Sequence, residues 1–225
     1  MSLSYWDGAY RSDRKIWGRR PGEAAQAAAK YVAEVKFPTA GKRLLDLGCG
    51  YGRDVLYLAS HWKVRATGVD SSEQAIEMAR TESVRSNKRD VEFRRARFQE
   101  ISDGPFDLVY AANLYQILPA EERKQLCRTV ESNLAPGGLF LFGTLSTRDP
   151  EHAGKGTEVP GDPNSWVEKT YIHLSDREEL EDEFGFLEFR RIYEHEFLEP
   201  RADGTTHHHL SWILIGARTG GSAAE

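Results

Sequence analysis

The chain has 225 residues, 40% of them hydrophobic and 29% charged, with a formal net charge of −5. This length and composition favour one α/β domain with a core of its own, and they exclude an intrinsically disordered protein. Positive and negative side chains are interspersed along most of the chain, so a nucleic-acid-binding protein with a basic face is not expected.

The elements follow in a regular order. Residues 1–40 are expected to form an N-terminal cap and a helix. Residues 43–145 then alternate short apolar runs with amphipathic stretches, which is typical of a parallel sheet with crossover helices. Five strands are expected over residues 43–47, 64–69, 91–95, 106–111 and 139–145. Helices are expected over about residues 53–60, over 72–86 with Ser72 as N-cap, and from Pro119 to the Pro136-Gly137-Gly138 turn.

This alternation breaks at residues 146–174, which contain three prolines, three glycines and no steady period. A structureless connection of this length is usually a lid or a substrate-binding loop. Ser175, with Glu178 three residues later, predicts a capped helix. Two strands, 187–198 and 208–217, follow on either side of a short turn, so the last strand should be antiparallel to its neighbour. Residues 219–225 are expected to be a loose tail of this single domain (1–225).

The stretch LLDLGCGYGRDVLYL, residues 44–58, places a glycine-rich loop between a strand and a helix. Glycines let the backbone approach a ligand where a Cβ would collide, and a helix N-terminus offers unpaired N–H groups. A dinucleotide site would have the spacing G-x-G-x-x-G, whereas this loop has D-x-G-x-G-x-G. Its Asp46 suits a cationic ligand. Asp70 ends the second strand and can accept hydrogen bonds from ribose hydroxyls, although alone it would indicate only a helix start.

These features resemble the cofactor-binding motif of class I S-adenosylmethionine (SAM) methyltransferases, and the pattern is nearest to the small-molecule thiopurine and tellurite-resistance enzymes. Over about Leu44 to Ala217 the resemblance implies a three-layer, Rossmann-like α/β fold. Five parallel strands would be followed by a C-terminal hairpin whose last, antiparallel strand lies between the fifth and sixth. It implies SAM as cofactor and S-adenosylhomocysteine as product. The expected cofactor-binding residues are Asp46, Gly48, Gly50, Asp70, Ser71, Phe98, Asn113, Trp6, Tyr10 and Trp17.

The adenine end departs from the family pattern. Many relatives have an aspartate after the third strand that accepts from the adenine amino group, and this sequence has Arg97 there. Arginine has no acceptor atom. Phe98 can still stack on the ring, and either Gln99 or Glu100 is a candidate for the missing acceptor.

The N-terminal aromatic residues Trp6, Tyr10 and Trp17 are spaced as in the cap that folds over the cofactor in the thiopurine and tellurite-resistance enzymes. Aromatic rings attract a sulfonium by cation–π interaction and exclude water. A simpler interpretation is that each ring only docks the segment onto the sheet.

Histidines are the remaining candidates. His207, His208 and His209 begin the last strand, which should place them on the sheet edge where the parallel strands end. His195 and His173 should gather at the same edge, near a polar acceptor. No metal site is expected, because no carboxylate or cysteine pattern accompanies these histidines.

The resemblance therefore implies an enzyme that transfers a methyl group in line to a heteroatom of a small molecule. A neutral nitrogen or oxygen acceptor needs a base, for which Tyr115 and His173 are the candidates, whereas a thiolate or metalloid acceptor needs none. The alternatives are a non-catalytic SAM-binding or scaffold protein and, less favoured, a nucleotide-dependent oxidoreductase. The two cysteines without metal spacing and the absence of long apolar runs favour a reduced, cytoplasmic protein with no membrane partner, either a monomer or a homodimer.

Overall fold

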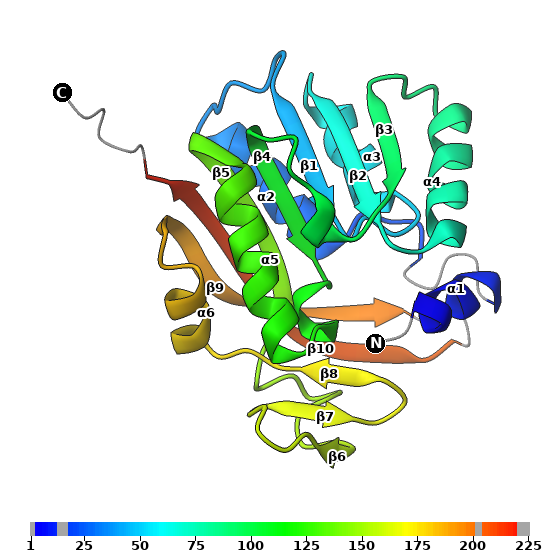
Figure 1. Cartoon of the computed structure of the whole chain (residues 1–225), viewed down its shortest axis with the longest axis vertical. Helices are drawn as coiled ribbons and strands as arrows, with labels where there is room; N and C mark the ends of the chain where they lie inside the picture. Colours follow the sequence, from blue (N-terminus) through cyan, green and yellow to red (C-terminus); the bar gives the residue numbers. More distant parts are fainter. Residues whose placement is uncertain (1–2, 13–17, 201–203, 220–225) are drawn as a thin grey trace.

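A seven-stranded sheet runs through the centre of the molecule in the order β3-β2-β1-β4-β5-β10-β9 (Figure 1). The computed structural model describes residues 3–12, 18–200 and 204–219. The five parallel strands are β1 (Arg43–Leu47), β2 (Arg65–Asp70), β3 (Val91–Arg95), β4 (Phe106–Ala112) and β5 (Leu134–Leu145). The strands β9 (Leu187–Pro200) and β10 (Thr206–Arg218) form the hairpin, and β10 is antiparallel to both of its neighbours. The predicted sheet, with its seventh strand between the fifth and sixth, is confirmed.

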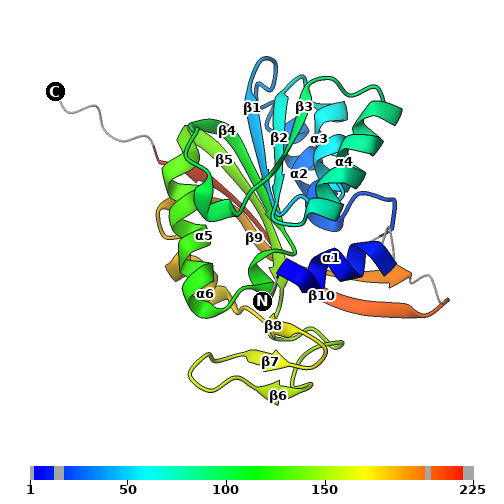
Figure 2. The ribbon, with the colours of Figure 1, turned by 45° about the vertical axis from the view of Figure 1, so that its right-hand side comes forward.

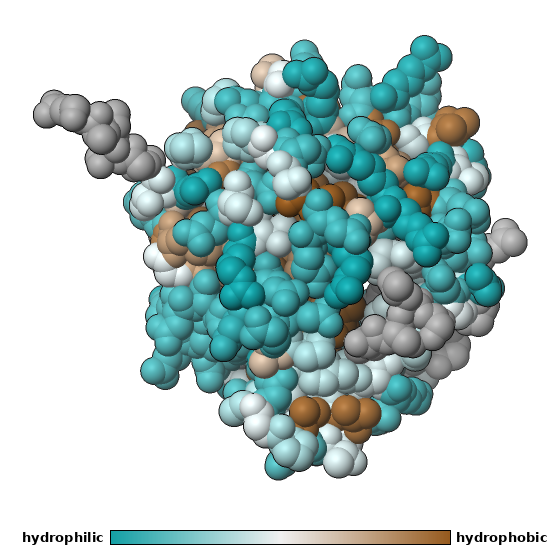
Figure 3. All heavy atoms as spheres, in the orientation of Figure 1, coloured by the Kyte–Doolittle hydropathy of each residue, from teal (hydrophilic) through white to brown (hydrophobic). Residues whose placement is uncertain are grey.

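Helices cover both faces of this sheet. One face carries α2 (Glu23–Glu34), α3 (Arg53–His61) and α4 (Glu73–Arg85), and the other carries α5 (Ala120–Asn133) and α6 (Arg177–Glu183). Leu44 packs into the first layer and Leu45 into the second, as expected where successive side chains point to opposite faces. Figure 3 shows a mostly hydrophilic face with small separate hydrophobic patches, so the apolar side chains are gathered in the two core layers. No helix in the described part of the chain is both long and apolar enough to cross a membrane.

The N-terminal helix α1 (Leu3–Ser12) lies across the sheet edge at which the parallel strands end. It lies beside the start of α4 and the far end of the β9–β10 hairpin (Figure 2). Its Trp6 and Tyr10 pack with Tyr51 of the glycine loop and with Ala75 of α4. The helix therefore covers the loop predicted to bind the cofactor.

The Pro136-Gly137-Gly138 turn lies inside β5, which begins at Leu134 and not at residue 139. The turn shifts the register of β5 against β4. Phe106 pairs with Leu134, but Leu108, two residues later, pairs with Leu139. Gly137 has a φ of +72°, a conformation that favours glycine. The predicted turn is present, but it interrupts the strand instead of preceding it.

The helix α6 begins at Arg177 and is capped by Asp176, whose carboxylate accepts from the Glu179 N–H at 2.9 Å. The predicted capping box of Ser175 and Glu178 is wrong, because the helix begins one residue later than expected. Ser175 has another role, because its backbone N–H donates to Leu145 O at 2.9 Å and its carbonyl accepts from Thr147 and Trp212. By contrast, the Ser72 cap of α4 is confirmed, since its Oγ accepts from the Ala75 N–H at 3.1 Å.

Residues 146–174 are not structureless. They contain a second, three-stranded antiparallel sheet of β6 (Thr157–Glu158), β7 (Ser165–Val167) and β8 (Tyr171–His173), below the hairpin in Figure 1. A buried ion pair fixes this sheet to α5, with Arg123 Nη2 at 2.8 Å from Asp162 Oδ1. Tyr171 also donates to Asp162 at 2.7 Å. Long-range polar contacts of this kind leave no periodic pattern in the sequence.

Candidate functional site

A cavity of about 390 Å³ opens at the carboxyl ends of β1, β2 and β4, beside α1. Its walls come from the glycine loop, the ends of β2 and β4, the segment after β3, the helix α1 and the first turns of α3 and α5. The lining residues are Trp6, Tyr10, Asp46, Gly48, Cys49, Gly50, Tyr51, Arg53, Asp54, Val69, Asp70, Ser71, Ala96, Arg97, Phe98, Gln99, Tyr110, Ala112, Asn113, Leu114, Ile117, Leu118, Pro119 and Glu122.

The glycine loop folds tightly because its glycines adopt left-handed conformations, with φ of +74° at Gly48 and +53° at Gly50. A Cβ on Gly50 would lie 2.9 Å from the Tyr10 hydroxyl, and one on Gly48 would lie 3.1 Å from a Leu114 methyl carbon. Side chains at these two positions would therefore displace α1 or the segment that follows β4. The loop leaves its backbone open to a ligand in the cavity.

Asp46 at the end of β1 is the most unusual polar group of the cavity wall. It is 2% exposed, and no described residue forms a hydrogen bond with its buried Oδ2. Burial, and then the nearby carboxylates of Asp54 and Asp70, raise the pKa of Asp46 well above its usual value. A buried carboxylate oxygen without a hydrogen-bond partner is costly, so this position favours a cationic ligand in the cavity.

Asp70 is held at the end of β2 by the loop itself. Its Oδ2 accepts from the Gly50 N–H and its Oδ1 from the Ser72 N–H, each at 2.9 Å. Burial raises the pKa of Asp70, and these backbone hydrogen bonds offset part of that rise. Each carboxylate oxygen can accept a further hydrogen bond. Asp70 can therefore fix the glycine loop and receive a ligand hydroxyl at the same time.

The segment after β3 forms the other end of the cavity. Phe98 and Gln99 line it, and the Gln99 Oε1 is buried with no hydrogen-bond partner in the described part of the chain. The Gln99 Nε2 donates to Gln125 at 3.1 Å, which fixes the amide plane. Glu100 is already engaged, because its carboxylate accepts from the Arg97 N–H at 3.1 Å. Of the two acceptor candidates, only Gln99 lines the cavity with an unused acceptor.

The structure brings most of the predicted cofactor-binding residues to this cavity. Those that line it are Asp46, Gly48, Gly50, Asp70, Ser71, Phe98, Asn113, Trp6 and Tyr10. Trp17 lies outside the described residues. Tyr10 is 5% exposed, and its ring meets that of Tyr51 edge-on at 6.1 Å between centroids.

Sequence reasoning missed a polar cluster in the cavity wall, which is formed by Arg53, Asp54 and Tyr110. Asp54 accepts from Arg53 Nε at 2.9 Å and from the Tyr110 hydroxyl at 3.0 Å, and it also accepts from the Gly22 N–H at 2.8 Å. The Arg-Asp pair directly after the glycine motif was the available signal. Through Gly22, Asp54 also fixes the start of α2 to the start of α3.

The two predicted catalytic residues do not reach the cavity. Tyr115 is fully buried against Phe142 and Phe184, and its hydroxyl donates to Glu179 Oε1 at 2.9 Å. His173 is 2% exposed, and its ring lies within 2.9 Å of Glu179 and Ser165. Burial and the Glu179 carboxylate raise the pKa of Tyr115, which opposes a role as base. The structure therefore corrects the expectation that Tyr115 or His173 is the base. Both side chains contact Glu179 and hold together β8, α6 and the turn after β4.

The histidines at the start of β10 lie at the predicted edge of the sheet, but they do not line the cavity. The start of β10 lies just beyond the end of β5, since Ser146 N–H donates to Leu210 O at 2.9 Å. Within the described part of the chain, no histidine lines the cavity. His195 lies 2.9 Å from Glu23 of α2, and His208 pairs with Glu196. His209 contacts a carboxylate of the loop after β5, outside the cavity.

The sheet order and the acidic, glycine-lined cavity define the fold of a class I methyltransferase domain. Residues 44–138, from β1 to the turn within β5, match the family model described as "Methyltransferase domain".

Individual curated proteins are also similar to this chain. Cyclopropane-fatty-acyl-phospholipid synthase from Escherichia coli (strain K12) is 27% identical over 168 residues, which is 75% of this chain but 38% of that protein. The chain thus spans well under half the length of this relative.

Two solved structures share the fold over nearly the whole chain. One is described as "Conversion of a Disulfide Bond into a Thioacetal Group during Echinomycin Biosynthesis", with 18% identity, a TM-score of 0.73 and coverage of 99% of this chain and 95% of that one. The other is the Burkholderia thailandensis 1,6-didemethyltoxoflavin-N1-methyltransferase with bound 1,6-didemethyltoxoflavin and S-adenosylhomocysteine. It is 16% identical, with a TM-score of 0.69 and coverage of 96% and 87%.

Proposed function

We propose that the cavity binds SAM and that the protein transfers the methyl group to a heteroatom of a small molecule. The observation that carries this proposal is Asp46, a buried carboxylate of the cavity wall with an unpaired oxygen beside the glycine loop. The ammonium group of the methionine part of SAM supplies the positive charge that this position favours. The family match over residues 44–138 and the bound S-adenosylhomocysteine of the Burkholderia enzyme support the same ligand.

Other residues fit the rest of the cofactor. Asp70 would accept from the ribose hydroxyls, Phe98 would stack on the adenine ring, and Gln99 Oε1 would accept from the adenine amino group. Trp6 and Tyr10 of α1 would close the site and exclude water.

When bound, SAM supplies a methyl group already activated by a positively charged sulfur. The protein then has to align the acceptor with the methyl group and keep water away. With Tyr115 and His173 outside the cavity, we propose that positioning by α1 and by the end of β4 is the chain's main contribution. The bound small molecule of the Burkholderia enzyme supports an acceptor of that size class.

Calorimetry with SAM, S-adenosylhomocysteine and NAD tests the proposed cofactor. We expect SAM and S-adenosylhomocysteine to bind and NAD not to bind, because the D-x-G-x-G-x-G loop lacks the spacing of a pyrophosphate site. Incubation with labelled SAM and a panel of small thiols, amines and phenols would then identify the acceptor. Preference for NAD over SAM would contradict the proposal.

Gln99→Leu is expected to weaken SAM binding by roughly tenfold, because loss of one hydrogen bond from a buried amide corresponds to about 1–1.5 kcal/mol. The measurement is calorimetry with SAM and with an analogue whose adenine lacks the amino group. The variant and the wild type should bind the analogue equally well. Equal weakening for both ligands would mean that Gln99 acts only by holding the loop.

Tyr115→Phe is expected to lower the free energy of unfolding by about 1–2 kcal/mol and to leave SAM affinity unchanged. The reason is that the hydroxyl donates to Glu179 inside the protein and not to a ligand in the cavity. Urea unfolding and calorimetry on the same preparation measure both quantities. If Tyr115 does contact the ligand, affinity will fall while stability stays the same.

A further inference from the structure

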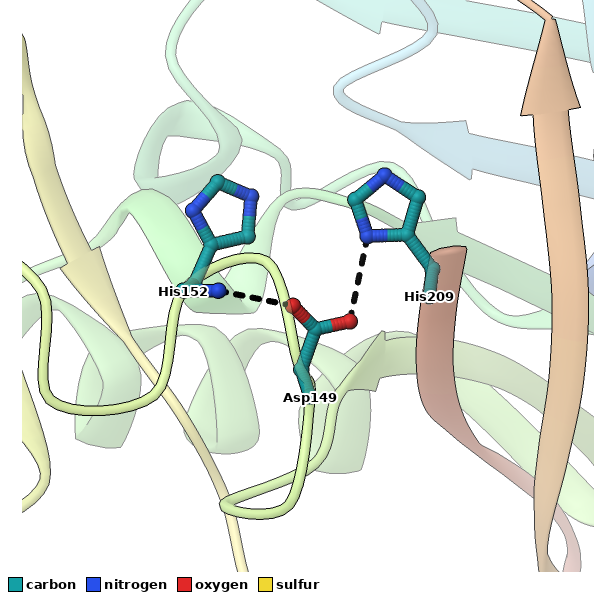
Figure 4. A group of neighbouring side chains, drawn as sticks. All are labelled: Asp149, His152 and His209. Atoms are coloured by element: carbon teal, nitrogen blue, oxygen red, sulfur yellow. Dashed lines mark hydrogen bonds and ion pairs between the residues drawn. The ribbon is translucent and has the colours of Figure 1, made fainter. Parts of the chain in front are cut away.

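Two histidines and an aspartate converge where the loop after β5 meets the start of β10 (Figure 4). Asp149 and His152 come from the loop, and His209 comes from β10. One imidazole nitrogen or carboxylate oxygen from each residue lies within 4.8 Å of the other two. Asp149 is fully buried, His209 is 4% exposed and His152 is half-buried.

The backbone fixes the carboxylate of this cluster. Asp149 Oδ1 accepts from the Glu151 and His152 N–H groups at 3.1 and 3.0 Å, and Oδ2 accepts from the Leu210 N–H at 2.9 Å. Outer hydrogen bonds of this kind orient the carboxylate ligands of metal sites. Asp149 thus presents Oδ2 to His209 in a defined direction, held by both the loop and the strand.

The ring of His209 lies between two carboxylates. Its Nε2 is 3.4 Å from Glu199, and its Nδ1 is 3.1 Å from Asp149 Oδ2. Metal-binding histidines commonly donate one ring N–H to a carboxylate and use the other nitrogen as the ligand. In that tautomer the Nδ1 lone pair faces the Asp149 oxygen, so either a proton or a metal ion must lie between the two atoms. Tetrahedral zinc ligands at 2.0–2.1 Å lie roughly 3.3 Å apart, close to the observed separation.

His152 supplies the third side chain. Its ring lies opposite that of His209, with 5.7 Å between centroids and 19° between planes, above the Asp149 carboxylate in Figure 4. No described residue forms a hydrogen bond with the His152 ring, although the side chain is half-buried. A proton shared by Asp149 and His209 would account for the short distance between these two residues. It would not account for the His152 ring, which lies beside them without a hydrogen bond from a described residue.

We propose that Asp149, His152 and His209 bind a divalent first-row transition metal ion of the Zn²⁺ class. Two imidazoles and one carboxylate suit such ions better than Mg²⁺ or Ca²⁺, which prefer oxygen ligands. Three protein ligands leave at least one coordination position for water or an anionic oxygen. The ligands come from residues 149, 152 and 209, a spacing that no local sequence motif contains. The proposal stands independently of methyl transfer.

Titration of the chelator-treated full chain, carrying no histidine tag, with Zn²⁺ and Co²⁺ tests this site. We expect one equivalent of each to bind, and Co²⁺ to give the strong visible absorption of a four-coordinate ion. His152→Asn should weaken Zn²⁺ binding by at least about tenfold. The matched control is His208→Asn, because His208 neighbours His209 but is exposed and paired with Glu196. This control should bind Zn²⁺ as the wild type does.

The melting temperature separates ligand loss from misfolding. Without metal, His152→Asn should melt as the wild type does, since its ring forms no hydrogen bond with a described residue. Added Zn²⁺ should raise the melting temperature of the wild type and of His208→Asn but not that of His152→Asn. Absence of binding at one equivalent would overturn the proposal. Equal losses in His208→Asn and His152→Asn would also overturn it, because the exposed histidine run would then be the binding site.

Discussion

Asp70→Ala is expected to weaken SAM binding by more than tenfold, which corresponds to about 1.4 kcal/mol or more. The carboxylate has two roles in the structure, since it fixes the glycine loop through Gly50 and Ser72 and lines the cavity. Removing it takes away the proposed acceptor for the ribose hydroxyls and loosens the backbone that the ligand approaches. Calorimetry with SAM and with S-adenosylhomocysteine measures the effect, and both affinities should fall by the same factor.

The two roles of Asp70 can be separated. Asp70→Asn keeps an acceptor oxygen, so it should cost less SAM affinity than the alanine variant. The matched control is Asp90→Ala, an exposed aspartate immediately before β3, which should bind SAM as the wild type does. Unchanged affinity in Asp70→Ala would remove this residue from the proposed cofactor site.

The sequence predicts the sheet well because its signals are local. An apolar run predicts its own strand, and Ser72 predicts the start of the helix that follows it. The short link between the last two strands predicts that they are antiparallel. The glycine loop and Asp70 are predictable for the same reason, since each directly follows a strand that the pattern identifies. A ligand site at the carboxyl ends of parallel strands follows from their order alone.

The predictions that failed depend on partners far away in the sequence. Tyr115 follows β4 as a ligand-lining residue would, but Glu179, 64 residues later, draws its hydroxyl into the core. Ser175 has the pattern of a cap, but its backbone pairs with Leu145 and Trp212. The converse case is His209, whose carboxylate partner Asp149 lies 60 residues earlier. The missing carboxylate pattern was the reason for expecting no metal there.

Arg123→Met is expected to lower the free energy of unfolding by about 3–5 kcal/mol, the range for removing one partner of a buried ion pair. The guanidinium joins Asp162, Tyr171 and the Leu118 carbonyl at 2.7–3.0 Å, and the Arg123 and Asp162 side chains are 8% and 9% exposed. Without the guanidinium, the buried Asp162 carboxylate loses the positive charge that it pairs with. Arg128→Met is the matched control on the same helix, because its pair with Glu121 is exposed. It should change stability by less than about 0.5 kcal/mol.

The same pair predicts how stability depends on pH. Burial raises the pKa of Asp162, but hydrogen bonds from Arg123 and Tyr171 outweigh it and hold the pKa at about 2. The pKa of an unfolded aspartate is about 3.9, so the charged form stabilises the fold above that pH, and the contribution is lost as pH falls toward 2. The difference in unfolding free energy between the wild type and Asp162→Asn should therefore be constant above about pH 5 and shrink below pH 4.

Hydrogen exchange shows which part of the fold loses stability when the Arg123–Asp162 ion pair is removed. In Arg123→Met, the amides of β7 and β8 should lose protection before those of the central sheet, because the ion pair fixes the small sheet to α5. The role of residues 146–174 as a lid stays a prediction, and the same measurement with S-adenosylhomocysteine tests it. A segment held mainly by Arg123 and Asp162 should show equal protection with and without ligand, whereas a lid should gain protection when the cavity is filled.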